Sequence, residues 1–430
     1  MALEPGRTIE ELQELRELTG TELGAQRVCW TETWREARAW LRAKFEELPV
    51  DVEQDEAGNL WATLHGQSER AVVIGGHIDS VPDGGWLDGC LNTLAGLESL
   101  RRIAAEGTPD VTVRLVDWAD EEGARFRSSL LGSSACSGAL DVDSARQLTD
   151  RDGVLLPDAL AEHGVLLDRM KDARQQLDSA AAYLELHIEQ GPVLERLGLP
   201  LGAVLGTFGV ERYVVRFLGQ TAHSGSTPME DRRDAFAGAA RLSLEIRECT
   251  RSVGAGAVST TGSVVTQPGI VTAVAGVCEM TVDIRHLDPD VVAMLLRSAR
   301  EASERIAAEE RLEVEWEYLW NIHPIPFDPT LIDLAGEAIE EVAGKSHRLP
   351  SGPLHDAAEV TRAGVPAVML FVQSLNGLSH TKEEDTKLDH IELSVAALDR
   401  LASKAIDYVL TGEPASGPSP PASFRHAGRS

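Results

Sequence analysis

Residues 71–79 read AVVIGGHID, an apolar run that ends in two glycines, a histidine and an aspartate. A helix-like segment, LNTLAGLESLRRIAAEG, follows at residues 91–107, and a second apolar run, VTVRLVDWADEEG, follows at residues 111–123. A strand, a helix and a second strand in this order predict a parallel sheet with crossover helices. Because strands end in loops and loops carry chemistry, the polar residues behind each strand are the first candidates for a site.

Helical periodicity precedes this unit over residues 9–47, and Thr31 is a candidate helix cap. The apolar stripe of this region consists of Trp34, Ala37, Leu41 and Phe45. Residues 50–66, VDVEQDEAGNLWATLHG, predict two strands around a Gly-Asn turn.

The pattern of apolar and polar residues changes after about residue 209, where it predicts several amphipathic strands and two long helices. One of the predicted strands is GIVTAV, at residues 269–274. We expect an inserted α+β domain over residues 212–327, within a catalytic domain made of residues 1–211 and 328–412. The Pro/Ser-rich tail, residues 413–430, is expected to be disordered.

The net charge of the protein excludes some classes of binding partner. Forty basic and 69 acidic side chains give a formal net charge of −29, which repels nucleic acids and anionic membrane surfaces. No secretory signal or membrane-length apolar run is evident. The five cysteines are scattered and odd in number, which indicates reduced thiols and a cytoplasmic protein.

His77 and Asp79 flank one residue of an extended segment, so their side chains point to the same side. The aspartate can there orient the imidazole or bind a metal beside it. Asp88 follows across a glycine turn. It can be a ligand, but it can equally form the turn and cap the helix that begins near Leu91, so both interpretations stay open here.

Two adjacent glutamates and two further histidines also follow apolar segments. Glu121 and Glu122 suit a metallohydrolase, because one carboxylate can bind metal while the other activates water, although a solvated acidic turn is the commoner explanation. His187 lies in the alternating segment YLELH, where a histidine is also commonly a hydrogen-bonded core residue. His380 lies in NGLSHTKEED beyond a predicted strand at residues 367–373, and can also be an exposed loop residue.

The joint pattern is more informative than any of its members. Three histidines, one aspartate and two glutamates fall at predicted strand ends of one α/β unit, and such ends meet at one edge of a parallel sheet. They form the ligand set of two hydrolytic metal ions, about 3.5–4 Å apart, that share a carboxylate and an activated water. The sequence therefore predicts a two-metal hydrolytic site.

Ordered blocks over nearly the whole chain resemble the hydantoinase/carbamoylase group of amidases, within the aminoacylase and carboxypeptidase-like M20 metallopeptidase clan. The blocks are DEAGNLWATLHG, GGHIDSVPDGGWLDGCLN, DEEGARF, LLGSSA, LHIEQGPVLE, TAHSGSTPMEDRRDA, VDIRH and GLSHTKEED. LHIEQGP and HSGSTPMEDRRDA are the most distinctive of the carbamoylase group. The resemblance implies an α/β catalytic domain with a central, mostly parallel sheet, and a smaller α+β lid and dimerisation domain.

The resemblance also implies a role for each member of the metal set. The implied ligands are His77, Asp88 and His187 for one ion, and Asp88, Glu122 and His380 for the other. Asp88 bridges the ions, Glu121 is the general base, and Asp79 orients His77. Two divalent ions per subunit are expected, zinc or manganese, with cobalt or nickel possible because such ligand sets accept each of them.

Three further residues match positions that bind substrate in this family. His223 is implied to polarise the scissile carbonyl or stabilise the oxyanion, commonly across the interface of a homodimer. Gln190 resembles a substrate-binding glutamine, and Arg285 resembles the arginine that binds the substrate carboxylate through its planar fork. The lid is expected to close and bring His223 and Arg285 to the substrate.

Two stretches depart from the family pattern, and both fall where the acid end of a carbamoyl amino acid would bind. The family's N-V-I-P-G stretch is TAVAG here, with Thr272 at the asparagine and Ala275 at the proline. Its SGAGHDA stretch is SGPLHDA here, so Leu354 replaces a glycine.

The expected activity is hydrolysis of a linear amide or ureido C–N bond, with an N-carbamoyl amino acid or related ureido acid as the small-molecule substrate. An N-acyl amino acid, a dipeptide or an unusual secondary amide is the alternative, because a bulkier and less polar pocket disfavours a small ureido acid. A catalytically silent binding protein is the third alternative, although none of its ligand positions is lost.

Overall fold

The computed structural model describes residues 2–254 and 256–411. The chain divides into two compact units: Gly206–Pro326 form one, and the described residues on either side of it form the other. The insert expected from the sequence covers residues 212–327. The tail expected to be disordered, residues 413–430, lies outside the described residues.

A nine-stranded sheet forms the centre of the first unit. Its path runs through β16 (Ile325–Pro326), β8 (Leu201–Thr207), β18 (Ala367–Val372), β7 (Ala180–Ile188), β5 (Ser68–Gly76), β6 (Val111–Asp117), β4 (Leu60–Leu64) and β3 (Asp51–Gln54), and β17 (Arg348–Ser351) pairs with β8. The four central strands, β18, β7, β5 and β6, pair in parallel, whereas the outer pairs on this path are antiparallel. The predicted α/β fold with a central, mostly parallel sheet is therefore confirmed.

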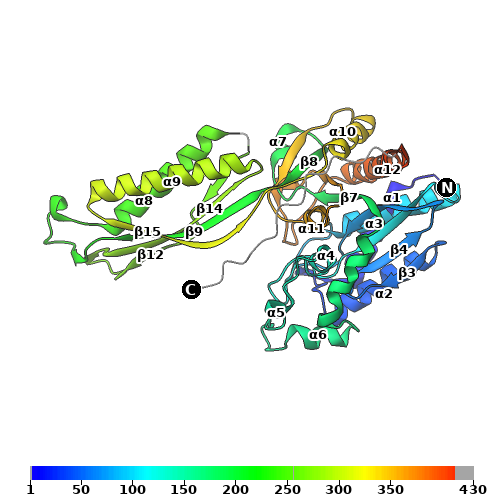
Figure 1. The fold of residues 1–430 in the computed structure, drawn as a ribbon, viewed down its shortest axis with the longest axis horizontal. Helices are drawn as coiled ribbons and strands as arrows, with labels where there is room; N and C mark the ends of the chain where they lie inside the picture. Colours follow the sequence, from blue (N-terminus) through cyan, green and yellow to red (C-terminus); the bar gives the residue numbers. More distant parts are fainter. Residues whose placement is uncertain (1, 255, 412–430) are drawn as a thin grey trace. The chain divides into compact units, whose positions relative to one another are not determined.

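Long helices cover the central strands because their apolar faces need a partner. α3 (Cys90–Glu106) and α12 (Leu388–Thr411) pack against each other and against β5 and β7, and α1 (Pro5–Thr19) contacts both helices. α10 (Pro329–Ala343) lies against α12 and β18 (Figure 1). Among the described residues, no helix is long and apolar enough to cross a membrane.

The remaining elements of this unit are short. They are α4 (Leu131–Ser137), α5 (Val142–Ala145), α6 (Leu156–Glu162), η1 (Leu167–Leu177), α7 (Val193–Leu197), α11 (Asp356–Arg362) and η3 (Leu375–Gly377). α11 packs on β7 and β18, and α4 packs on α11 and η1. The loops that leave the carboxyl ends of the parallel strands run between these elements.

The N-terminal region contains two helices rather than one continuous helical segment. α1 ends at Thr19, and two short paired strands, β1 (Gly20–Thr21) and β2 (Gly24–Ala25), precede α2 (Glu32–Glu46). The apolar periodicity of the sequence does not reveal this break. Gly20 begins β1 and Gly24 begins β2, and Gly24 has φ 129°, which favours glycine. The prediction for α2 is confirmed: Thr31 caps it by accepting from the backbone of Trp34, and the predicted apolar stripe is buried.

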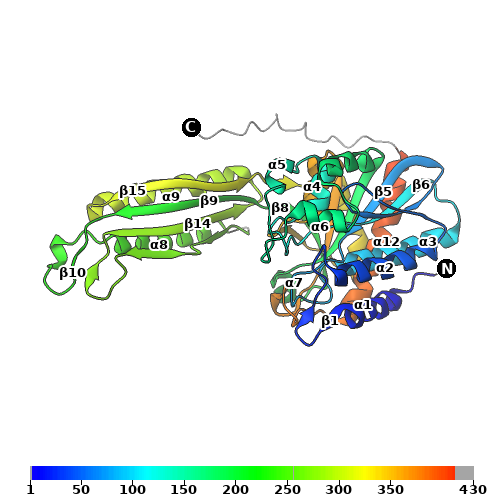
Figure 2. The same cartoon turned by 90° about the horizontal axis from the view of Figure 1, so that it is seen from below.

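The second unit, Gly206–Pro326, is a sheet with two helices. The sheet consists of β11 (Val258–Thr260), β14 (Val277–His286), β9 (Gly209–Leu218) and β15 (Glu313–Ile322), and β12 (Val264–Gln267) pairs with β14. α8 (Ala235–Val253) and α9 (Pro289–Glu310) lie side by side against β14 and β9 (Figure 1 and Figure 2). β14 alternates buried and half-buried residues, because one face of the sheet carries the helices.

The strand predicted at residues 269–274 is largely wrong. Only Ala273–Val274 form a strand, β13, which pairs with β10 (Ala222–His223). The side chains of Ile270 and Val271 are exposed, and their backbone has no strand partner. β-branched composition predicted a strand here, but burial and pairing decide whether one forms.

The chain enters and leaves the second unit at adjacent positions. β8 carries the chain towards the insert, and β16 brings it back as the antiparallel neighbour of β8, with Thr207 opposite Ile325. Both strands belong to the nine-stranded sheet. The insert is therefore a single excursion from one edge of that sheet.

A buried ion pair joins α2 to the end of β6. The Nε atom of Arg38 lies 2.9 Å from Oδ2 of Asp117, and Arg38 also donates to the carbonyl of Gly58. Oδ1 of Asp117 accepts from the backbone of Ile78, at 2.8 Å. The carboxylate therefore supports both a buried guanidinium and the loop that follows β5.

Asp117→Ala should lower the free energy of unfolding by about 3–5 kcal/mol, because it leaves the Arg38 guanidinium buried without its counter-charge. Urea unfolding followed by tryptophan fluorescence measures the loss. Asp51→Ala is the matched control, since Asp51 forms an exposed pair with His65 that contributes less than about 1 kcal/mol. Equal losses for the two variants would contradict this assignment.

Candidate active site

The residues predicted from strand ends come together at one edge of the central sheet. His77 follows β5 directly, Glu121 and Glu122 follow β6, His187 is the penultimate residue of β7, and His380 lies in the loop beyond β18. The register explains the convergence, since Gly76 lies opposite Asp117 and His187 lies opposite Phe371. The parallel strands thus deliver side chains far apart in the chain to one place.

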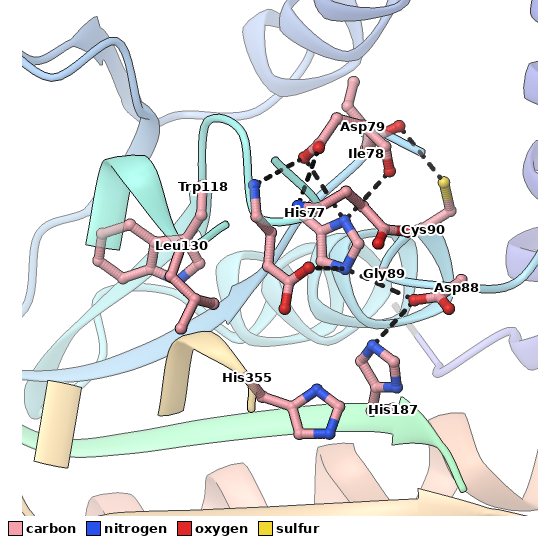
Figure 3. A network of polar contacts seen from close by, with 12 residues as sticks. His77, Ile78, Asp79, Asp88, Gly89, Cys90, Trp118, Leu130, His187 and His355 are labelled. Atoms are coloured by element: carbon pink, nitrogen blue, oxygen red, sulfur yellow. Dashed lines mark hydrogen bonds and ion pairs between the residues drawn. The ribbon is translucent and has the colours of Figure 1, made fainter. Parts of the chain in front are cut away.

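The first group of possible metal ligands is His77, Asp88 and His187, all three buried. Oδ1 of Asp88 lies 3.1 Å from Nε2 of His187 and 3.6 Å from Nε2 of His77. Figure 3 shows Asp88 facing both rings. Asp88 does not cap α3, whose N-cap is Gly89 and has no side-chain cap.

The second group consists of Asp88, Glu122 and His380. Nε2 of His380 lies 3.3 Å from Oε2 of Glu122 and 3.6 Å from Oδ2 of Asp88. In each group the offered ligand atoms all lie within 4.8 Å of one another. Asp88 belongs to both groups and directs one carboxylate oxygen to each.

The backbone fixes the tautomers of the two buried histidines. Nδ1 of His77 donates to the carbonyl of Asp79 at 3.1 Å, and Nδ1 of His187 donates to the carbonyl of Ile188 at 2.9 Å. Since a carbonyl only accepts, Nδ1 of each ring carries a hydrogen, and Nε2 is the ring atom that points to Asp88. Nε2 of His77 is buried without a hydrogen-bond partner, as expected for a ligand atom.

Asp79 lies between the loops that follow β5 and β6. Its carboxylate oxygens accept from the backbone N–H groups of Glu121 and Glu122, each at 3.3 Å. Its Oδ1 also lies 3.5 Å from Nδ1 of His77 (Figure 3). Asp79 therefore supports the histidine and the two glutamates together.

Burial and mutual repulsion shift the carboxyl groups of the site. Burial raises the pKa of Glu121 well above its usual range, and the nearby His77 opposes that shift. Burial and the Asp88 carboxylate likewise raise the pKa of Glu122. Burial opposes ionisation of Asp88, but the His187 imidazole outweighs it and lowers the pKa below its usual range.

This donor set fits a pair of divalent cations. Imidazole nitrogens and carboxylate oxygens are the ligands that zinc, manganese, cobalt and nickel accept in hydrolytic sites. Crowded buried carboxylates also need positive charge, which two cations would supply. The residues that would hold them are those of the two groups sharing Asp88.

Several backbone positions around the site lie in the left-handed region that non-glycine residues seldom adopt. Asp120, Gln190 and His380 have φ of 60°, 55° and 57°. Such residues cluster at functional sites, where the surrounding contacts hold them in place. Gly89 has φ 64°, and a Cβ there would lie 2.3 Å from the His77 ring, so this position requires glycine.

Gln190 faces the metal groups. Its Nε2 donates to Oδ2 of Asp88 at 2.8 Å and lies 3.4 Å from Nε2 of His380, while its buried Oε1 has no hydrogen-bond partner among the described residues. The free acceptor is suited to a polar ligand.

Leu354, the departure from the family pattern, is half-buried in the loop between β17 and α11.

Sequence reasoning missed two residues at this edge. The buried ring of His355 packs on His187 (Figure 3), with centroids 4.4 Å apart. Its Nε2 forms a hydrogen bond with Ser351. The buried Glu384 accepts from the backbone of Leu87 and Asp88. Their signal in the sequence is their place in the blocks SGPLHDA and GLSHTKEED, next to residues already chosen.

His223, Thr272 and Arg285 lie in the second unit. The β10–β13 pair sets His223 opposite Ala273, the neighbour of Thr272. The His223 side chain is exposed, and its Nδ1 accepts from the backbone of Gly225 at 3.1 Å. In the neutral ring the hydrogen is therefore on Nε2, which can donate to an oxyanion.

Arg285, on β14, is held by a carboxylate on the same strand. Its Nε donates to Oδ1 of Asp283 at 2.7 Å, and Oδ2 of Asp283 accepts from Nε of Arg212 at 2.6 Å. Arg212 in turn lies over the ring of Trp320, 5.0 Å from its centroid. Two guanidinium groups thus share one carboxylate.

Comparisons with known proteins identify the family of the chain. The sequence pattern of peptidase family M20/M25/M40 matches residues 73–404. An N-carbamoyl-L-amino acid amidohydrolase from Geobacillus stearothermophilus is 34% identical over 85% of this chain and 90% of its own length. An allantoate amidohydrolase from Bacillus subtilis is 30% identical over 89% of this chain and 92% of its own length.

The fold is similar to that of a crystallised hydantoinase/carbamoylase family amidase from Burkholderia ambifaria. The TM-score is 0.85 at 31% sequence identity, over 94% of this chain and 97% of the other. The resemblance noted in the sequence blocks is therefore confirmed. The chain belongs to peptidase family M20/M25/M40, within its hydantoinase/carbamoylase group of amidases.

Proposed function

We propose that the chain is a metal-dependent amidohydrolase whose substrate is an N-carbamoyl amino acid or a related ureido acid. The observation that carries the proposal is the pair of ligand groups that share Asp88, with Glu121 beside them. Relatives named for N-carbamoyl-L-amino acid and allantoate hydrolysis support the ureido class. Each predicted metal-ligand position carries a residue that can bind metal, and the chain belongs to a family of hydrolases. Neither observation supports a catalytically silent binding protein.

Glu121 is the general base of the proposed reaction. Its Oε2 lies 3.7 Å from Nε2 of His77, next to the first ligand group without belonging to it. Two divalent cations, zinc or manganese, with cobalt or nickel possible, supply Lewis-acid polarisation and lower the pKa of water when bound. Glu121 takes a proton from the attacking water and later gives it to the leaving nitrogen.

The proposed reaction balances without a further reactant. Water oxygen attacks the ureido carbon, the bond from that carbon to the amino acid nitrogen breaks, and the nitrogen leaves with the proton from Glu121. The carbamic acid that remains breaks down to carbon dioxide and ammonia. His223, with hydrogen on Nε2, is suited to stabilise the oxyanion of the tetrahedral intermediate.

A second substrate class is favoured by the two departures from the family pattern. Leu354 brings an apolar, half-buried side chain to the position next to His355, where the family has glycine. Thr272 lacks the amide of the asparagine it replaces. Both changes favour a larger and less polar substrate, such as an N-acyl amino acid or a dipeptide.

We extend the proposal to the state of the protein in the cell. A homodimer is proposed because His223 matches a residue that the family commonly supplies across a dimer interface. A cytoplasmic location is proposed because all five cysteines are unpaired. The net charge of −29 disfavours nucleic acid and anionic membranes as partners.

Ammonia release should identify the substrate class when the metal-loaded protein is assayed against N-carbamoyl-L-amino acids, N-carbamoyl-β-alanine and allantoate. The value of kcat/KM for at least one ureido acid should exceed that for N-acetyl amino acids and dipeptides, measured in parallel by amine release. Activity confined to the N-acyl compounds or dipeptides would reject the ureido assignment and support the second class.

Glu121→Gln should lower kcat by about 10²- to 10⁴-fold while leaving the metal content near two ions per subunit, because it removes a proton acceptor and no ligand. Glu122→Ala should instead lose one of the two ions. Elemental analysis and steady-state kinetics measure both effects. Asp83→Asn, an exposed acid of the β5 loop, is the control; the roles are wrong if both glutamate variants lose metal equally.

Arg285→Ala should raise KM for an acidic substrate by about 10- to 100-fold with a smaller effect on kcat, the loss expected for one charge-assisted hydrogen-bond pair. Arg251→Ala is the control, since Arg251 is exposed and paired within α8. An unchanged KM would mean that the substrate carboxylate does not bind at Arg285.

A further inference from the structure

Glu384 connects the two loops that carry metal-binding groups. It lies four positions after His380, and its side chain is 2% exposed. Its Oε1 accepts from the backbone N–H groups of Leu87 and Asp88, each at 3.0 Å. A side chain of the His380 loop thus holds the main chain of the residue that belongs to both ligand groups.

The β5 loop is shaped around this carboxylate. A Cβ at Gly85 would lie 2.1 Å from Oε1 of Glu384, so only a residue without a side chain leaves room for it. The helix that follows begins with Gly89 as its N-cap. Two consecutive N–H groups aimed at one oxygen fix the peptide plane between Leu87 and Asp88, and with it the direction of the Asp88 side chain.

We propose that Glu384 is a positioning residue for the metal centre, which sets the Asp88 carboxylate and ties it to the loop that carries His380. The inference rests on the proposed function, because it assumes that the two ligand groups bind metal. Substitution of a residue that orients a metal ligand commonly lowers the metal affinity by about 10- to 100-fold. Because Asp88 serves both groups, loss of Glu384 weakens both sites together.

Cobalt(II) titration of the full-length, metal-free protein tests the proposal through affinity and the visible absorption bands of the bound ion, independently of turnover. Glu384→Asp keeps the carboxylate but withdraws it by one methylene, so it should weaken both sites by about tenfold or more and change the bands. Glu384→Gln keeps an acceptor oxygen at the same reach and should bind cobalt within about threefold of the natural protein.

Glu383→Ala is the matched control, because Glu383 is exposed on the same loop and forms hydrogen bonds with the nearby Thr381. It should leave both affinities unchanged. Thermal melting of each metal-free variant measures the folded fraction, so a loss of binding that merely follows unfolding is recognised and overturns the proposal.

The remaining outcomes separate the inference from the function. If the natural protein binds two cobalt ions and Glu384→Asp binds them equally well, Glu384 does not position Asp88, although the metal-dependent function stands. If Glu384→Asp weakens only one site, the coupling through Asp88 is wrong. If the natural protein binds no cobalt, the proposed function fails and the inference fails with it.

Discussion

The four parallel strands β18, β7, β5 and β6 end at one edge of the sheet, and the rest of the first unit depends on this arrangement. It collects side chains whose positions in the chain span residues 77–380, and it buries most of them. The loops that leave these ends are held by cross-links between them rather than by regular structure. Asp79 connects the β5 and β6 loops, and Glu384 connects the β5 and His380 loops.

Electrostatic crowding is the direct result of that convergence. Carboxylates from the β5 and β6 loops lie near two buried imidazoles; burial raises the pKa of Glu121 and Glu122, whereas the His187 imidazole lowers the pKa of Asp88. The backbone carbonyls that bind Nδ1 of His77 and His187 orient both rings so that their Nε2 atoms point to Asp88. Because these groups are already held in place, a cation bound here would require little reorganisation of the site.

Much of the candidate site could be predicted from the sequence, because its residues follow apolar runs and residue type restricts what they can bind. Other features depend on contacts that sequence separation conceals. Glu384 bonds to a backbone almost 300 positions away. For Asp88, residue type alone left a ligand and a helix cap both open, and the structure shows that it does not cap α3. Sequence periodicity and propensity describe what a segment prefers, but they do not show which segments pair or pack with it. For this reason they missed the break between α1 and α2 and wrongly predicted a strand at Ile270.

The pairing of β8 with β16 has a consequence for changes in the length of the second unit. Because Thr207 and Ile325 lie opposite each other, the two ends of the second unit leave and rejoin the sheet side by side. The length of such a segment has little effect on the entropy cost of closing it, because the paired strands already hold its two ends together. Replacement of that segment by another of different size would therefore leave the sheet and the candidate metal-binding edge in place.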